Sequence, residues 1–147
     1  QVLSVRRAQL TDLDQIVELG IQTWPDAPFS QLPPDRAWMR QSIARFLETP
    51  DAAGWLLVDD KTIVGVIAVS LLTHWMTAQR LCFQWWWWIR PEHRIGHGLR
   101  LLGMAENWAR HHRATAMHLL AVNEEMEKLC RALHYNKLET TYTKELR

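Results

Sequence analysis

The chain has 147 residues, which suits a single folded unit, because a chain of this length buries roughly two-thirds of the surface that its unfolded form exposes. Its composition is 48% hydrophobic and 22% charged, which excludes an intrinsically disordered protein. Seventeen basic and sixteen acidic residues leave a formal charge of +1, so the chain lacks the basic excess on which nonspecific binding of nucleic acid depends.

The cysteine content and the apolar runs indicate a compartment and a class of protein. Cys82 and Cys130 are too few for a disulfide framework, and no segment has the pattern of a signal peptide, so we expect a cytoplasmic protein. The longest apolar runs, 63–72 and 85–89, are much shorter than the roughly 20 residues that a helix needs to cross a bilayer. We expect neither membrane nor nucleic acid as a partner, and a homodimer stays open.

The first quarter of the chain predicts a strand followed by a helix. Residues 2–9 are short and begin with β-branched character, which favours a strand. Apolar residues then recur at helical spacing as far as Pro25, which ends the helix. Asp12 and Gln15 have the spacing of a capping box, so we expect them to begin this helix together.

A proline-rich loop and a hairpin come next. The stretch 25–34 is predicted to be a loop, after which Asp35 begins a second helix with an apolar face. The runs 55–58 and 62–72 are apolar and β-branched, and residues 59–61 between them are typical of a hairpin turn.

The remaining chain alternates strands and helices. The aromatic run 80–89 predicts a strand, and 98–112 an amphipathic helix. Residues 116–122 are predicted to form a buried strand, 124–133 a short helix, and 140–146 a final strand with weak alternation. No repeat or linker divides the chain.

The segment 89–102 is the most informative part of the sequence. It joins a strand to an amphipathic helix through Gly96 and Gly98, with basic or ionisable residues around them. Glycines let a backbone approach a ligand closely, and the first N–H groups of a helix have no partner within the helix. Together with the helix dipole these groups favour phosphate, which predicts an anion site; the alternative is a turn whose glycines serve only steric needs.

A first motif resembles the acetyl-CoA signature of the GNAT acetyltransferases. It consists of Pro-Glu-His-Arg, Gly-x-Gly and Leu-Leu, followed by a helix that ends in Ala-Glu-x-Trp-Ala-Arg. In that family the CoA pyrophosphate binds a turn written Gln or Arg, two residues, Gly, one residue, Gly or Ala. Counted back from Gly96, the first position falls on His93. If Arg94 is first instead, His97 takes the glycine position and the turn is one residue shorter than usual.

A second motif follows the strand after that helix. In the family it reads Asn, Ala three residues on, Leu-Tyr six and seven on, and Gly with an aromatic residue at the end. The corresponding residues here are Asn123, Met126, Leu129, Cys130, His134 and Tyr135. The spacing matches in full, and Met126, Cys130 and His134 are substitutions.

The resemblance covers nearly the whole chain and implies both a fold and an activity. It implies one α/β domain over residues 1–147, GNAT-like, with a central mixed, mostly antiparallel sheet and helices on both faces. It also implies transfer of an acetyl group from acetyl-CoA, the co-substrate, to an amine of a small molecule or a protein. The residues implied to bind the cofactor are Trp88, Ile89, Arg94, Ile95, Gly96, His97, Gly98, Leu99 and Asn123.

Three residues are candidates for proton transfer. In many relatives a tyrosine at the Cys130 position protonates the leaving CoA thiolate, and a thiol can in principle do the same. The alternatives are a buried, inert cysteine and a protein that has lost turnover and serves as a binding or regulatory module. Relatives often place a Glu on the strand before the turn, where the nearest polar residue is Gln84, whose amide cannot usefully accept a proton. His118 is an alternative base, or else a core histidine with satisfied hydrogen bonds.

The loop 25–34 lies where relatives line the acceptor pocket. It and its flank offer Trp24, Asp26 and Phe29, and an amine would meet a carboxylate there. The alternative is an ordinary surface loop.

Two further patterns invite a functional interpretation. Exposed aromatic residues on a sheet can stack on bases, but helices on both faces of a sheet bury alternate rings, so we expect the tryptophans of 85–88 to lie in the core. His93 and His97 have the spacing of some zinc sites, but they flank a turn and have no acidic or thiol partner at suitable spacing, so we expect no metal.

Overall fold

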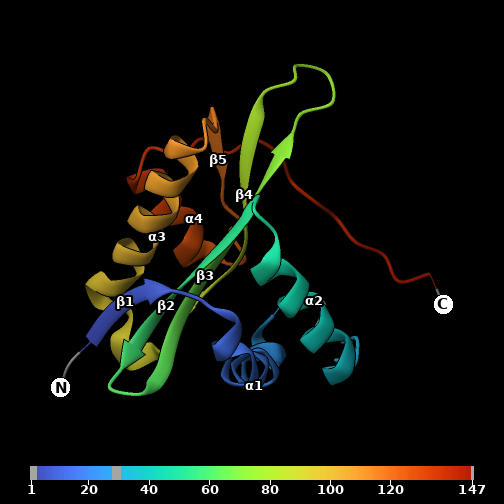
Figure 1. Ribbon diagram of the computed structural model, residues 1–147. Helices are drawn as coiled ribbons and strands as arrows, with labels where there is room; N and C mark the ends of the chain where they lie inside the picture. Colours follow the sequence, from blue (N-terminus) through green and yellow to red (C-terminus); the bar gives the residue numbers. More distant parts are fainter. Residues whose placement is uncertain (1–2, 28–30, 147) are drawn as a thin grey trace.

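The computed structural model describes residues 3–27 and 31–146, apart from the Ile95 side chain, and contains a five-stranded sheet with helices on both faces (Figure 1). The strands are β1 (Leu3–Arg7), β2 (Ala52–Asp59), β3 (Thr62–Thr73), β4 (Arg80–Ile89) and β5 (Ala116–His118), in that spatial order. Neighbours from β1 to β4 are antiparallel, and β5 is parallel to β4. The predicted α/β fold with a mixed, mostly antiparallel sheet is confirmed.

The helices divide between the two faces of the sheet (Figure 1). They are α1 (Leu13–Thr23), α2 (Arg36–Glu48), α3 (Arg94–His111) and α4 (Glu124–Ala132). Short 3-10 turns, η1 (Leu10–Asp12), η2 (Trp24–Asp26) and η3 (Pro91–His93), lead into α1, follow it and lead into α3. None of the helices in the described part of the chain is long and apolar enough to span a membrane.

Each face of the sheet has its own hydrophobic core. On one face, buried residues of α3 such as Leu101 and Ala105 pack against Ile67 and Val69 of β3. On the other, Ile16 and Leu19 of α1 pack with buried residues of β2 and β3. Alternate side chains of a strand point to opposite faces, so β2 and β3, covered on both sides, are apolar almost throughout.

The expected capping box of Asp12 with Gln15 is wrong. The Asp12 carboxylate turns back and accepts hydrogen bonds from the Gln9 backbone N–H at 2.8 Å and from the Arg6 guanidinium at 2.8 and 2.7 Å. The capping box is therefore one turn earlier, between Gln9 and Asp12 around η1. The prediction that the second helix begins at Asp35 is confirmed: Asp35 is the N-cap of α2, and its side chain accepts a hydrogen bond from the Trp38 N–H at 3.0 Å.

Three predicted elements differ in the structure. The helix expected from residue 98 begins at Arg94, so the glycines lie within its first turns. The strand expected at 116–122 ends at His118, and its residues are not fully buried. Residues 140–146, expected to form a strand, have no regular secondary structure. A strand needs a neighbour that satisfies its backbone groups, and local sequence does not report whether that neighbour is present.

Candidate functional site

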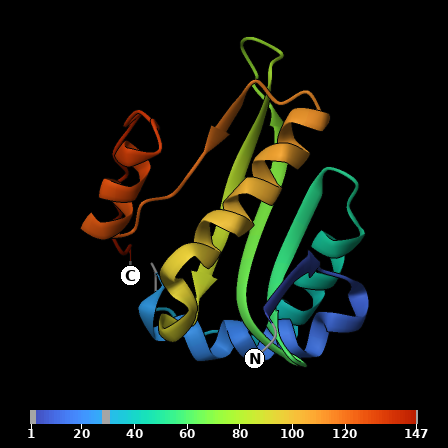
Figure 2. The same cartoon turned by 90° about the vertical axis from the view of Figure 1, so that its left-hand side faces the viewer.

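The central feature of the site is the separation of two parallel strands. β4 and β5 pair only between Leu81–Phe83 and Ala116–His118. Beyond this point β4 continues to Ile89, while the chain after β5 turns away from it toward α4 (Figure 2). Backbone N–H and C=O groups on the separated edges are thereby released from strand pairing, and a ligand with amide groups can satisfy them.

Gln84 lies where the strands part. Its side chain is only 5% exposed, and its Oε1 accepts a hydrogen bond from the Leu120 backbone N–H at 2.9 Å. This bond holds the chain after β5 beside β4 although strand pairing has ended. Gln84, predicted as a catalytic candidate, is therefore a structural bridge between the separating segments.

A β-bulge follows Gln84 in the same strand. Val69 of β3 pairs with Gln84 and Ala68 pairs with Trp86, which leaves Trp85 without a partner residue. A bulge bends the strand and changes the direction of the extra side chain. Trp85 is 55% exposed, so the expectation that residues 85–88 all lie in the core is wrong at this position.

His118 lies at the end of β5, opposite Phe83. The two rings stack with centroids 4.5 Å apart and an interplanar angle of 10°. His118 is half-buried, so it is neither a fully enclosed core residue nor a freely exposed one. Of the three catalytic candidates, the structure brings Gln84 and His118 to the same point of the sheet.

The predicted cofactor turn connects β4 to α3. Gly96 has φ of +83°, a left-handed conformation that side chains rarely adopt, and a Cβ built there would have no heavy atom within 4 Å. The Arg94 Nε donates to the Ile89 carbonyl at 2.8 Å, which fixes the turn to the end of the strand. The space beside Gly96 and the N-terminus of α3 fit an anionic group.

Other residues of this turn have partners within the protein. His93 Nε2 lies 3.7 Å from a carboxylate oxygen of Asp59 at the end of β2. The His97 ring lies 3.3 Å from the Arg100 guanidinium on the next helical turn. A Cβ at Gly98 would lie 3.5 Å from the Ile89 side chain, an ordinary van der Waals contact, so packing on β4 does not by itself require glycine there.

The remaining predicted cofactor residues lie on several elements. Ile89 is buried in the α3 core, while the Trp88 ring packs against the core on the opposite face. Leu99 is exposed on α3, and the backbone of Ile95 lies in the same helix. Asn123 caps α4, because its side chain accepts from the Met126 N–H at 2.9 Å. The structure joins Ile89, Arg94 and Gly98 in one place and leaves Asn123 on a separate element.

Cys130 lies on α4 and is half-buried. Burial, with a smaller contribution from Glu127, raises the pKa of its thiol above the ordinary value. Near neutral pH the group therefore stays protonated.

Tyr135, just after α4, donates a hydrogen bond from its hydroxyl to a carboxylate oxygen of Glu106 on α3 at 2.8 Å, which the sequence did not indicate. A pairing between distant segments of this kind has no local sequence signal.

The candidate acceptor residues lie around η2. The Trp24 Nε1 donates to the Leu32 carbonyl at 2.8 Å, which ties the two ends of the loop together. Asp26 is exposed, and Phe29 lies outside the described residues. The structure thus gives Trp24 a role in shaping the loop.

A cavity of about 310 Å³ lies between α3, β5 and the segment after α4. Its lining includes Glu106, Arg110, Met117 and Tyr135, and it contains none of the predicted cofactor or catalytic residues. Within residues 3–27 and 31–146, no group of three or more His, Cys, Asp or Glu side chains could hold a metal ion.

Comparison with known proteins identifies the family. The sequence matches the Acetyltransferase (GNAT) family over residues 13–135. No curated protein sequence matches it significantly. Three solved structures have the same fold at low sequence identity. The aminoglycoside acetyltransferase AAC(6')-Iy, bound to a bisubstrate analogue, superposes with a TM-score of 0.79 at 16% identity, over 100% of this chain and 99% of that one.

An acetyltransferase of Trypanosoma brucei has a TM-score of 0.77 at 18% identity, covering 99% of this chain and 100% of that one. A predicted acetyltransferase of Clostridium acetobutylicum, solved with acetyl-CoA, has a TM-score of 0.82 at 12% identity, covering 98% of this chain and 96% of that one. The family match spans both motifs and both of the separating strands, β4 and β5. The chain therefore belongs to the GNAT acetyltransferase family and is an acetyltransferase that uses acetyl-CoA as its co-substrate.

Proposed function

We propose that the protein is an N-acetyltransferase, which moves the acetyl group of acetyl-CoA to an amine of a small molecule or a protein. The observation that carries the proposal is the separation of β4 from β5, bridged by the Gln84 hydrogen bond, on the strand whose far end meets the Gly96 turn. One strand thus has a candidate anion site at its end and unpaired backbone groups along its edge. That combination suits an extended ligand with phosphates at one end and amides along its length.

The residues proposed to hold the cofactor are those of the turn and the strand before it. The backbone from Arg94 to Leu99 would face the pyrophosphate, with Gly96 supplying the close approach that its left-handed φ permits. Arg94 would keep the turn attached to Ile89. The thioester would lie farther along β4, toward the bulge at Trp85, where the strands part.

The transfer forms a bond between the amine nitrogen and the acetyl carbon and breaks the bond between that carbon and sulfur. The amine must first lose its ammonium proton, and the departing thiolate must gain one. His118 is the titratable side chain at the end of β5, where the strands part, and we propose it, directly or through water, as the group that receives the amine proton. The protonated Cys130 thiol is the candidate donor of the proton that the departing thiolate needs, although a thiol is a weak hydrogen-bond donor.

Two measurements test the proposal. Acetyl-CoA should raise the melting temperature, since a ligand bound only by the native state stabilises it. Release of free CoA should then accelerate on addition of at least one amine from a panel of small amines and peptides. The absence of any thermal shift at millimolar acetyl-CoA would contradict the cofactor site. Cofactor binding without turnover on any amine would favour the alternative, a binding or regulatory module.

A further inference from the structure

Trp85 is the exception within its run of tryptophans. Trp86 and Trp88 pack against the α1 core, and Trp87 packs against the α3 core. The bulge removes Trp85 from this alternation and leaves more than half of its surface exposed. Packing in the core therefore does not explain why a large aromatic side chain is present at position 85.

Trp85 belongs to a row of three rings that crosses the two separating strands. The centroid of its ring lies 6.3 Å from that of Phe83, at an interplanar angle of 29°. The Phe83 ring in turn stacks on the His118 ring with centroids 4.5 Å apart. The Trp85 indole N–H donates to the Ser70 hydroxyl on β3. The row is therefore fixed at Trp85 by a hydrogen bond and at Phe83 by strand pairing with His118.

The row lies on the same side of the sheet as α1 and α2. Cys82 packs in the α3 core, so the next side chain, Phe83, points to the opposite face. The upper parts of β3 and β4 extend past the end of α2 on this face (Figure 1). The rings thus flank the point where Gln84 bridges the separating strands, on the face of the sheet that α1 and α2 cover lower down.

We propose that Trp85, the exposed end of this stack with Phe83 and His118 behind it, forms the acceptor platform, on which an amine carrying a planar aromatic ring stacks before acetyl transfer. This proposal rests on the proposed N-acetyltransferase activity. Parallel rings with centroids 4.5 Å apart overlap face to face, so Phe83 and His118 cover each other, and the exposed end of the stack is Trp85. A planar ring can extend the stack at Trp85 with little loss of side-chain entropy, because the indole is already held by its hydrogen bond. The ammonium of the acceptor is also attracted to an aromatic face. His118, the candidate base, is the third ring of the stack.

The kinetic test compares three primary amines that differ in their carbon skeleton: phenethylamine, cyclohexylethylamine and butylamine. The wild type should prefer phenethylamine over cyclohexylethylamine, and both over butylamine. Trp85→Ala should lower kcat/KM for phenethylamine about tenfold, the low end of the effect of losing a stacked base, and mainly through KM. Butylamine should change little. Trp85→Phe keeps a ring and should retain most of the preference.

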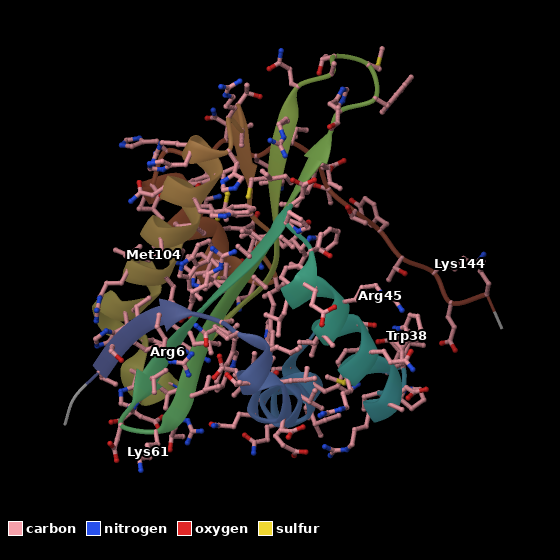
Figure 3. All side chains as sticks on the ribbon, viewed as in Figure 1. Arg6, Trp38, Arg45, Lys61, Met104 and Lys144 are labelled. Carbon is pink, nitrogen blue, oxygen red and sulfur yellow. The ribbon has the colours of Figure 1, made fainter. Side chains whose placement is uncertain are left out.

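Trp38→Ala is the matched control, because Trp38 is similarly exposed, at 59%, but lies near the start of α2, where Figure 3 labels it, and is not part of the row of rings. This variant should leave all three rates unchanged. An equal loss on all three amines in Trp85→Ala, or a loss of the same size in Trp38→Ala, would overturn the platform.

A binding measurement separates this proposal from the proposed function. The indole N–H resonance of Trp85, assigned by its disappearance in Trp85→Phe, should shift when phenethylamine is added at millimolar concentration, and butylamine should leave it in place. This readout needs no turnover. If acetyl-CoA fails to bind but the resonance shifts, the proposed function fails and the platform stands. If acetyl-CoA binds and turnover proceeds on other amines without a shift, the platform is wrong and the activity stands.

Discussion

The buried Gln84 side chain and the backbone N–H of Leu120 are joined by a hydrogen bond of 2.9 Å at the point where β4 and β5 stop pairing. Pairing of the two strands ends one residue before Gln84, so this side-chain hydrogen bond connects the two segments where backbone hydrogen bonds between them have ended. It sets where the separation of the strands begins.

Gln84→Met should therefore destabilise the protein. Methionine has a similar length but removes the acceptor of the Leu120 N–H, and the loss of such a partly buried hydrogen bond costs about 0.5–1.5 kcal/mol. Denaturant unfolding would measure the loss. Gln41→Met on the exposed face of α2 is the control and should change the free energy of unfolding by less than about 0.5 kcal/mol. Equal effects of the two changes would contradict the bridging role.

Gly96 and Gly103 form a matched pair within α3. A Cβ at either position would have no heavy atom within 4 Å, so steric contact does not distinguish them. Gly96 has φ of +83°, and Gly96→Ala should cost about 1 kcal/mol or more in backbone strain. Gly103→Ala should instead stabilise the helix by roughly 0.5–1 kcal/mol. Thermal unfolding would show opposite signs, and only Gly96→Ala should weaken acetyl-CoA binding.

Asp12 should contribute a pH-dependent part of the stability. It is 6% exposed, and the hydrogen bond from Arg6, with others, holds the pKa of its carboxyl below the ordinary value of 3.8. The lowered pKa means that the stabilisation is present above the pKa of the unfolded chain and is lost as pH falls through the folded-state pKa. Unfolding followed from pH 7 downward should therefore show wild type and Asp12→Asn converging below pH 4.

Asp14 provides the comparison for Asp12. It forms an ion pair with Arg40 but is exposed, so solvent screens the interaction. Asp14→Asn should change stability by no more than about 1 kcal/mol near neutral pH, whereas Asp12→Asn should cost about 1–3 kcal/mol. A larger loss in Asp14→Asn than in Asp12→Asn would show that burial does not set the strength of these pairs.

Cys130 is expected to pack rather than to catalyse. Cys130→Ala should leave turnover within a few-fold of wild type and lower the melting temperature, because a half-buried side chain loses contacts. Cys130→Tyr should overfill the site and destabilise by roughly 1–3 kcal/mol. A rate loss of about 10²-fold in the alanine variant, with an unchanged melting temperature, would instead identify the thiol as the proton donor.

The sequence by itself determined the elements whose signals are local. The apolar periodicity of α1, the start of the second helix at Asp35 and the hairpin between β2 and β3 each follow from neighbouring residues and were predicted. The strand predicted at 55–58 is longer in the structure, from Ala52 to Asp59. The Gly96 turn could be located because glycine is chosen where φ is positive. The family resemblance then supplied the fold class and the co-substrate.

Only the tertiary structure decided the features that depend on distant partners. The bulge that exposes Trp85 arises from register with β3, and the end of β5 at His118 from its separation from β4, which itself continues to Ile89. The hydrogen-bond partners of the Asp12 and Glu106 carboxylates come from packing between distant segments. Hydrogen bonds and burial are properties of pairs of residues, and a single sequence lists the members of these pairs without joining them. The run 85–88 therefore appeared in the sequence as four equivalent tryptophans, and the structure makes one of them, Trp85, the exposed end of a stack of rings.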